Sequence, residues 1–167
     1  MSRIAMRGRH WLARDEGCSQ VLAGWSAFPG AKLVAWLLAR SGDSIFWLAI
    51  AALLMWRRHP LGLALLTTLV LVIVATALAK GIFRRQRPQA KWAIATDKYA
   101  FPSGHAARAA AVAVTLGFAF PGWMLPLLLW AVGVGLARVV LGRHYISDVV
   151  AGLAFGFVIG FLSQGWL

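Results

Sequence analysis

The chain has 167 residues, of which 60% are hydrophobic and 13% are charged, and its mean hydropathy is +0.73. A soluble domain of this length could not bury so much apolar surface, so the composition excludes a soluble globular protein and indicates one embedded in a membrane. Lys and Arg outnumber Asp and Glu by 17 to 5, for a formal net charge of +12. On a membrane scaffold this excess indicates anionic lipid, cytoplasmic anchoring or a phosphate site, and it argues against nucleic acid as a partner. The single cysteine, Cys18, excludes an internal disulfide and a cysteine-based metal cluster.

The first 39 residues combine a basic N-terminus with a segment that has two interpretations. Residues 1–16 are rich in Arg and lack the apolar run of a cleavable signal peptide. Residues 17–31 are interrupted at Pro29 and followed by Lys32, so they fit either a broken membrane span or a segment in the interface. Of these two we favour a first span that continues to residue 38.

Five clearer spans follow as apolar runs with few charges, because an unpaired charge at the centre of the hydrocarbon costs roughly 2.5–3.5 kcal/mol. They cover residues 40–56, 61–80, 103–120, 123–141 and 145–164. We therefore predict an all-α fold, a polytopic transmembrane helical bundle of five to six spans with the active site at one membrane face. Residues 1–167 form a single domain, in which residues 40–165 are the catalytic bundle.

The long connection over residues 81–102 decides where the polar residues meet. It carries five basic residues and one acid, namely Arg84, Arg85, Arg87, Lys91, Lys98 and Asp97. The span before it ends, and the span after it begins, at one membrane face, and a tight turn at Pro121 brings the next span back to that face. Three clusters of polar residues at these ends therefore converge, and ionisable groups at membrane depth are functional candidates.

The first two clusters flank the long connection. Lys80 and Arg87 are close to two helical turns apart, so they share a face if the helix continues that far. Ser103 is suited to cap the following helix, and Gly104 lets an anion approach the backbone. Free N–H groups and the helix dipole favour phosphate there, beside His105. Taken singly, the first pair can also be an interface anchor and the second segment an ordinary helix cap.

The third cluster consists of Arg138, His144 and Asp148. A His and an Asp four residues apart share a helix face, so the carboxylate can hold one ring nitrogen and leave the other free. That is the orienting logic of a catalytic triad, here with the imidazole as nucleophile. The alternative is an ion pair at a helix end. Convergence of all three clusters on one face favours a single phosphate-handling site.

These motifs resemble a known family. Lys80-x6-Arg87-Pro88, then Pro102-Ser103-Gly104-His105, then Arg138-x5-His144-x3-Asp148 are similar in order and spacing to the tripartite signature of the type 2 phosphatidic acid phosphatase superfamily. That superfamily includes membrane lipid phosphatases, glucose-6-phosphatase and the vanadium haloperoxidases. The resemblance covers about residues 40–165 and departs at Ala137, where the family usually has Ser.

The resemblance implies a role for each matched residue. Phosphate oxygens would be held by Lys80, Arg87, Ser103, Arg138 and the backbone of Gly104. His144 would attack phosphorus to form a phosphohistidine, Asp148 would orient it, and His105 would protonate the leaving oxygen. Many relatives also carry Arg at the position of Arg85, which is a candidate for contact with the substrate headgroup. No cofactor or metal is expected, because fixed cations supply the charge and acids are too scarce for a metal cage.

The resemblance implies metal-independent dephosphorylation of a lipid phosphate or lipid pyrophosphate. Undecaprenyl pyrophosphate, phosphatidylglycerophosphate, phosphatidate, lipid A and phosphoinositides remain open as substrates. The alternative from another class is a non-enzymatic lipid-binding or transport-related protein that keeps the fold, which the presence of both histidines and Asp148 disfavours. A vanadium-dependent oxidase is disfavoured because those relatives are soluble and much longer.

Location and assembly are also expectations. Applied to the long connection, the positive-inside rule makes the motif face cytoplasmic, but those basic residues have a competing role at the phosphate site. Arg57 and Arg58 lie on the face opposite the motifs, and the N-terminal arginines join them there if residues 17–38 span. Counting only these residues makes the opposite face cytoplasmic. We therefore expect a bacterial inner membrane protein whose active site faces the periplasm or exterior. Gly152, Gly156 and Gly160 form a close-packing face, used within the bundle or as a seam between two copies. The expected partner is the membrane lipid substrate, and the chain is expected to be a monomer or weak homodimer.

Overall fold

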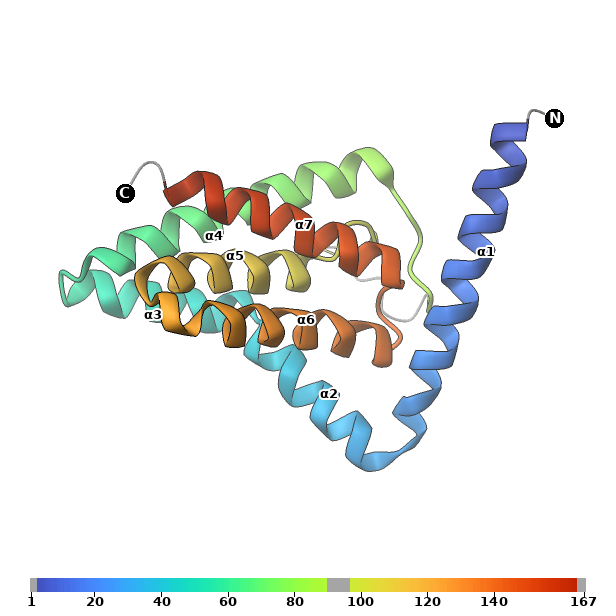
Figure 1. Ribbon diagram of the computed structural model, residues 1–167, viewed down its shortest axis with the longest axis horizontal. Helices are drawn as coiled ribbons and strands as arrows, with labels where there is room; N and C mark the ends of the chain where they lie inside the picture. The colour runs from blue at the N-terminus through green and yellow to red at the C-terminus, as the bar shows by residue number, and fades with distance from the viewer. Residues whose placement is uncertain (1–2, 90–96, 165–167) are drawn as a thin grey trace.

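The computed structural model describes residues 3–89 and 97–164, and the regular elements in these ranges are helices (Figure 1). They are α1 (Arg3–Gly24), α2 (Pro29–Ser41), α3 (Ser44–Trp56), α4 (Pro60–Phe83), α5 (Gly104–Ala119), α6 (Met124–Val140) and α7 (Ile146–Ser163), with short 3₁₀ turns η1 (Trp25–Ala27) and η3 (Pro121–Trp123). The predicted all-α fold is confirmed, and α3 to α7 correspond to the five clearer predicted spans. Lys91 lies outside the described residues.

The number of spans is not confirmed. Four helical segments in the described part of the chain are long and apolar enough to cross a membrane, namely Pro29–Trp56, Pro60–Phe83, Pro121–Val140 and Ile146–Ser163. The first of them joins α2 and α3. Helix α5 has 16 residues, whereas about 20 are needed for a full crossing. By length and composition the described residues therefore contain four candidate spans, fewer than the five to six that we predicted.

Residues 17–38 do not form one continuous helix, and the first span expected there is not confirmed. Helix α1 ends at Gly24, and Phe28 is extended with φ −85° and ψ 119° before α2 begins at Pro29. Proline has no backbone N–H and disfavours helical geometry in the residue before it, so a helix ends there and a new one starts. The interruption at Pro29 is a change of direction, and α1 stands across the axis of the bundle (Figure 1).

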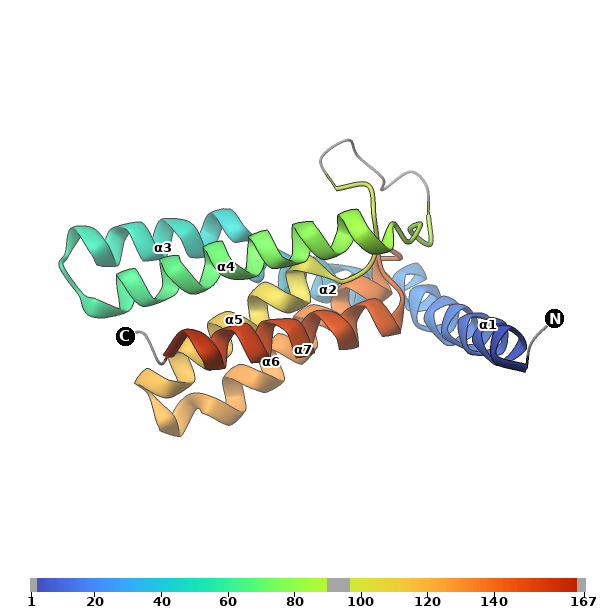
Figure 2. The same cartoon turned by 90° about the horizontal axis from the view of Figure 1, so that it is seen from above.

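Helix α5 lies at the centre of the bundle, between the α3–α4 pair and the α6–α7 pair (Figure 2). Most of its residues are buried and small, and α7 lies close against it through three glycines. A Cβ at Gly152 would stand 2.4 Å from the carbonyl oxygen of Ser103, and one at Gly156 would stand 1.9 Å from that of Ala107. Gly160 contacts the same helix. The glycine face therefore packs within the bundle, where small residues let backbones approach.

The ends of the helices sort the chain into two faces. Helix α4 ends, α5 begins, α6 ends and α7 begins at the same end of the bundle, which α1 crosses (Figure 1). The α3–α4 and α5–α6 connections lie at the other end. The structure thus brings the three polar clusters together as the sequence predicted. Arg57 and Arg58, in the α3–α4 connection, lie opposite them.

Candidate active site

Two cations of the first cluster share one carboxylate. Asp97 binds Nζ of Lys80 through one oxygen and Nη2 of Arg87 through the other. Arg87 is buried, and it also donates to the carbonyl oxygens of Asp97 at 3.1 Å and Arg143 at 3.2 Å. Burial opposes ionisation of Asp97, but Lys80 and Arg87 outweigh it and lower the pKa of this carboxyl. An anion is therefore already held where the family resemblance places phosphate.

His144 is buried, with 1% of its surface exposed, in the connection between α6 and α7. Its Nδ1 lies 2.8 Å from the carbonyl oxygen of Ala100. A carbonyl can only accept, so Nδ1 carries the hydrogen and Nε2 keeps its lone pair. Burial, reinforced by the charges of Arg138 and Arg87 and opposed by Asp148, lowers the pKa of His144 to about 4. A neutral imidazole with a free Nε2 is the nucleophilic form.

Asp148 contacts His144 less directly than the spacing indicated. Its Oδ2 lies 3.7 Å from Nδ1 of His144, too far for a hydrogen bond, and accepts the backbone N–H of Tyr145 at 2.8 Å. Its Oδ1 accepts from Arg85 at 2.9 Å. The expectation that Asp148 holds the ring through a hydrogen bond is therefore corrected: Ala100 does so. Asp148 turns toward Tyr145 because it caps the first turn of α7.

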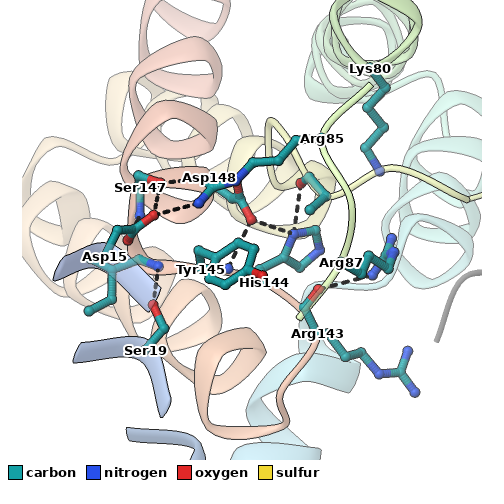
Figure 3. A network of polar contacts seen from close by, with 12 residues as sticks. Asp15, Ser19, Lys80, Arg85, Arg87, Arg143, His144, Tyr145, Ser147 and Asp148 are labelled. Atoms are coloured by element: carbon teal, nitrogen blue, oxygen red, sulfur yellow. Dashed lines mark hydrogen bonds and ion pairs between the residues drawn. The ribbon is translucent and has the colours of Figure 1, made fainter. Parts of the chain in front are cut away.

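Arg85 joins α1 to this network (Figure 3). Its guanidinium donates to Asp148, to the hydroxyl of Ser147 at 2.6 Å and to Asp15 of α1 at 2.8 Å, and it lies 4.1 Å from the centre of the Tyr145 ring. Two carboxylates and one aromatic face thus surround one cation. Arg85 makes these contacts within the protein, and the contact with the substrate headgroup that we expected for it stays a prediction.

Helix α1 also caps α7 from outside. Ser19 accepts the backbone N–H of Ile146 at 3.0 Å, and Asp15 accepts that of Ser147 at 3.0 Å. The first N–H groups of a helix have no partner within it, so these side chains satisfy two of them. Asp15 and Ser19 thereby place α1 on the same face as the polar clusters. We expected the N-terminal arginines on the opposite face if residues 17–38 span. The contacts of α1 with the start of α7 do not support that position.

His105, near the start of α5, has a carboxylate partner of its own. Its Nε2 lies 2.9 Å from Oδ1 of Asp43, at the bend between α2 and α3. Its Nδ1 lies 3.2 Å from Nη2 of Arg108. Gly42 allows the bend to sit close to α6, since a Cβ there would lie 2.6 Å from Cγ1 of Val134. The bend therefore delivers Asp43 to His105.

Two expected phosphate ligands have buried atoms without a hydrogen-bond partner in the described part of the chain. They are Oγ of Ser103 and Nε of Arg138. Ser103 is fully buried and occupies the N-cap of α5, but its side chain makes no capping bond. Buried polar atoms without partners are costly, so both are available to an incoming ligand.

Two cavities meet at the site. One of about 530 Å³ is lined by Lys80, Gly104 and His105, and one of about 400 Å³ by Asp43, His105 and Arg138. Asp97 borders both. No group of three or more His, Cys, Asp or Glu suited to a metal ion occurs among residues 3–89 and 97–164. Independence from metal stays a prediction.

Comparison with known proteins decides the family. A family model described as the PAP2 superfamily matches residues 61–167. The chain belongs to the PAP2 superfamily. This confirms the resemblance drawn from the three motifs, all of which fall inside the matched residues.

Members of the superfamily similar to this chain act on lipid phosphates. An undecaprenyl-diphosphatase of Sulfolobus acidocaldarius is 35% identical over 75% of the chain, which spans 66% of that protein's length. A decaprenylphosphoryl-5-phosphoribose phosphatase of Mycobacterium tuberculosis is 35% identical over 79% of the chain and 78% of its own length. The transmembrane PAP2-type phosphatidylglycerolphosphate phosphatase of Bacillus subtilis has the same fold, with a TM-score of 0.79 and 25% identity over 94% of this chain and 86% of its own. The chain is accordingly a multi-pass membrane protein.

The matched PAP2 motifs leave out three carboxylates of the site. Asp15 and Asp43 precede the matched residues, and Asp97 lies between the first two motifs. Only the scarcity of acids could have identified these three: the chain has five acids, and four of them, including Asp148, form ion pairs with motif residues or Arg85. In a basic membrane protein each acid is a candidate partner for a buried cation.

Proposed function

We propose that this protein hydrolyses a lipid phosphate or lipid diphosphate through a phosphohistidine intermediate on His144, without a metal. The observation that carries the proposal is the state of His144. The ring is buried, its Nδ1 is bound to a carbonyl, its Nε2 is left with a lone pair, and the positive charges of Arg87 and Arg138 act on it. A neutral imidazole among cations is suited to attack an anionic phosphorus centre.

The reaction would proceed in two displacements. Nε2 of His144 forms a bond to phosphorus while the bond from phosphorus to the lipid oxygen breaks, and Lys80, Arg87 and Arg138 hold the non-bridging oxygens. Permanently charged guanidinium groups with fixed donors suit the five-coordinate transition state. His105 acts as an acid in its imidazolium form: Asp43 holds the Nε2–H, and Nδ1–H protonates the leaving oxygen, which returns His105 to the neutral imidazole. Water then attacks phosphorus, His105 takes its proton, and phosphate leaves with His144 restored.

Substrate binding requires Asp97 to leave Lys80 and Arg87. Its carboxylate is a single anion on two cations, whereas phosphate offers up to two charges and more acceptor oxygens. The exchange keeps an anion on the two buried cations. We also propose that Ser103 and the Gly104 backbone complete the phosphate site, which the partnerless Oγ of Ser103 supports.

We propose that the site opens to the periplasm or exterior of a bacterial inner membrane. The support is the position of Arg57 and Arg58 at the opposite end of the bundle, where the positive-inside rule places the cytoplasm. The basic residues at the site end are weaker markers of topology, because binding of phosphate is a separate reason for them to be there. The N-terminal arginines do not add to this argument, because α1 lies at the site end.

Phosphate release tests the proposed function. The purified full chain in detergent is assayed with phosphatidate, phosphatidylglycerophosphate and prenyl mono- and diphosphates, with and without EDTA and vanadate. We expect turnover of at least one lipid, no effect of EDTA, and inhibition by vanadate, which mimics five-coordinate phosphorus. His144→Asn keeps the donor to Ala100 and should lose all but a few per cent of the rate. Loss of activity on chelation, restored by magnesium, would contradict the mechanism, and binding without turnover would favour a lipid-binding protein.

A further inference from the structure

Arg108 lies inside the site, although it belongs to none of the three motifs. It is one helical turn beyond Gly104 on α5, and its guanidinium folds back toward the start of that helix. Its Nη2 lies 3.2 Å from Nδ1 of His105. A Cβ at Gly104 would stand 3.0 Å from its Nη1, so the glycine leaves the room that Arg108 occupies. The guanidinium therefore lies against the two residues expected to meet the reacting phosphate.

Arg108 has no carboxylate partner in the described residues. Lys80, Arg85 and Arg87 each form an ion pair with an Asp. In the described residues no carboxylate oxygen lies within 4.0 Å of the Arg108 guanidinium, and Nε of Arg108 is buried without a hydrogen-bond partner. A cation at membrane depth is costly unless an anion accompanies it. The unpaired guanidinium thus has both the charge and a free donor for a bound anion.

The cavity at Arg108 has a polar and an apolar part. Lys80, Gly104, His105 and Arg108 line it, and it continues along α4 past Thr76 and Ala77 to Ile73, which lie deeper in the bundle than Lys80. A lipid chain would leave the site along this apolar wall. Arg108 then stands between the reacting phosphate and the lipid chain.

We propose that Arg108 binds the second, lipid-linked phosphate of a lipid diphosphate, so that the site recognises two adjacent phosphates. This inference rests on the proposed function and names its substrate class. The terminal phosphate would lie on Lys80, Arg87 and Arg138. Because Arg108 contacts His105, a phosphate bound to Arg108 would lie next to His105, with its bridging oxygen toward the terminal phosphate.

The chemistry of a diphosphate explains why a cation is needed there. Nε2 of His144 bonds to the terminal phosphorus, the bond from that phosphorus to the bridging oxygen breaks, and the lipid monophosphate departs with the electron pair. Charge then grows on the bridging oxygen and the second phosphate, where Arg108 neutralises it. Water later cleaves the bond from phosphorus to nitrogen and yields inorganic phosphate. A lipid monophosphate has an uncharged carbon at this position and gives Arg108 no anion to neutralise.

The test compares farnesyl diphosphate with farnesyl monophosphate, which share one chain, on full-length wild type and Arg108→Gln. A hydrogen bond to a charged group corresponds to about 10- to 100-fold in rate. We expect Arg108→Gln to lower kcat/KM for the diphosphate by about that factor and for the monophosphate by less than about threefold. Arg108→Lys, which keeps the charge, should fall between. Arg84→Gln, an exposed arginine at the same face, is the matched control and should change neither value.

Other outcomes separate this inference from the proposed function. Equal losses on both substrates, or no loss, would overturn the diphosphate site and leave the phosphatase intact. Turnover confined to phosphatidylglycerophosphate, whose two phosphates are not adjacent, would also overturn it. Failure of wild type on every lipid would remove both proposals. If Arg108→Gln does not fold, wild-type inhibition by farnesyl methylenebisphosphonate is compared with that by farnesyl phosphonate. A preference of tenfold or more for the bisphosphonate is expected, and equal inhibition would refute the site.

Discussion

Nε2 of His105 lies 2.9 Å from a carboxylate oxygen of Asp43, a residue 62 positions earlier in the chain. The other ring nitrogen faces Arg108, and a guanidinium can only donate, so Nδ1 accepts and Nε2 carries the hydrogen. Asp43 therefore holds the Nε2–H, and the proposed acid is the imidazolium that forms when Nδ1 also takes a proton. The proposed acid and the proposed nucleophile have opposite tautomers, each held by an acceptor from another part of the chain.

Asp43→Asn should weaken acid catalysis by His105. Proton donation matters most for a poor leaving group, so we expect a loss of about tenfold or more with an alcohol leaving group such as that of farnesyl monophosphate. With p-nitrophenyl phosphate, whose leaving group needs no proton, the loss should be smaller. Arg40→Ala removes the other partner of Asp43, at 3.4 Å, and serves as control. Equal losses on the two substrates would assign Asp43 a structural role only.

Asp15→Ala should reduce both stability and rate. It removes a cap on α7 and a carboxylate on Arg85, which is also bound to Asp148. Loss of a helix cap costs about 1 kcal/mol, and a displaced Arg85 no longer fixes Asp148 beside His144. We expect a lower unfolding midpoint and a several-fold lower kcat with KM little changed. Glu16→Gln alters the neighbouring exposed acid and should do neither, and an unchanged kcat in Asp15→Ala would dismiss the role of α1 in positioning.

The stability of the protein should fall between pH 6.5 and about 4. The native pKa of His144 is lowered to about 4 from 6.5 by burial, so in this window the unfolded chain binds a proton that the native chain does not. Unfolding therefore becomes easier as the pH falls, and full stability from this group exists above pH 6.5. The unfolding midpoint of wild type and His144→Asn across this range measures the effect, and a parallel pH dependence in the two would refute it.

The same pKa sets the acid limit of activity. Because His144 stays neutral until about pH 4, kcat/KM should not lose its nucleophile near pH 6.5. A phosphate monoester itself titrates near pH 6, so the profile is corrected for the substrate's own ionisation. An acid limb that remains at pH 6.5 after this correction would mean that the imidazole is not shielded as the structure indicates.

Membrane orientation can be tested with single cysteines in a Cys18→Ala background. Lys98→Cys at the site end should react with an impermeant thiol reagent in intact cells, and Arg57→Cys at the opposite end should not. Both positions are exposed. Glu16→Cys should follow Lys98→Cys, because α1 lies at the site end. The reverse pattern would place the site in the cytoplasm, and opposite behaviour of Glu16 and Lys98 would contradict the position of α1.

The sequence by itself determined the membrane setting, the five helices from α3 to α7, the family and the convergence of the motifs. These depend on local properties: a charge in hydrocarbon is costly wherever it occurs, and seven- or four-residue spacing places side chains on one helix face. The first span expected over residues 17–38 is not confirmed: the sequence shows an interruption at Pro29, but the direction in which the chain turns there is a property of the tertiary structure.

Only the tertiary structure decided which groups meet across the helices. Asp15, Asp43 and Asp97 are isolated acids with no spacing to mark them, and packing brings each to a cation or histidine 10 to 70 positions away. The sequence also cannot identify the carbonyl of Ala100 as the partner of His144, because every residue has a backbone carbonyl. Hydropathy and periodicity depend on neighbours in sequence, whereas ion pairs and hydrogen bonds depend on distances of a few ångströms that the packing of α1, the α2–α3 bend and the long connection creates.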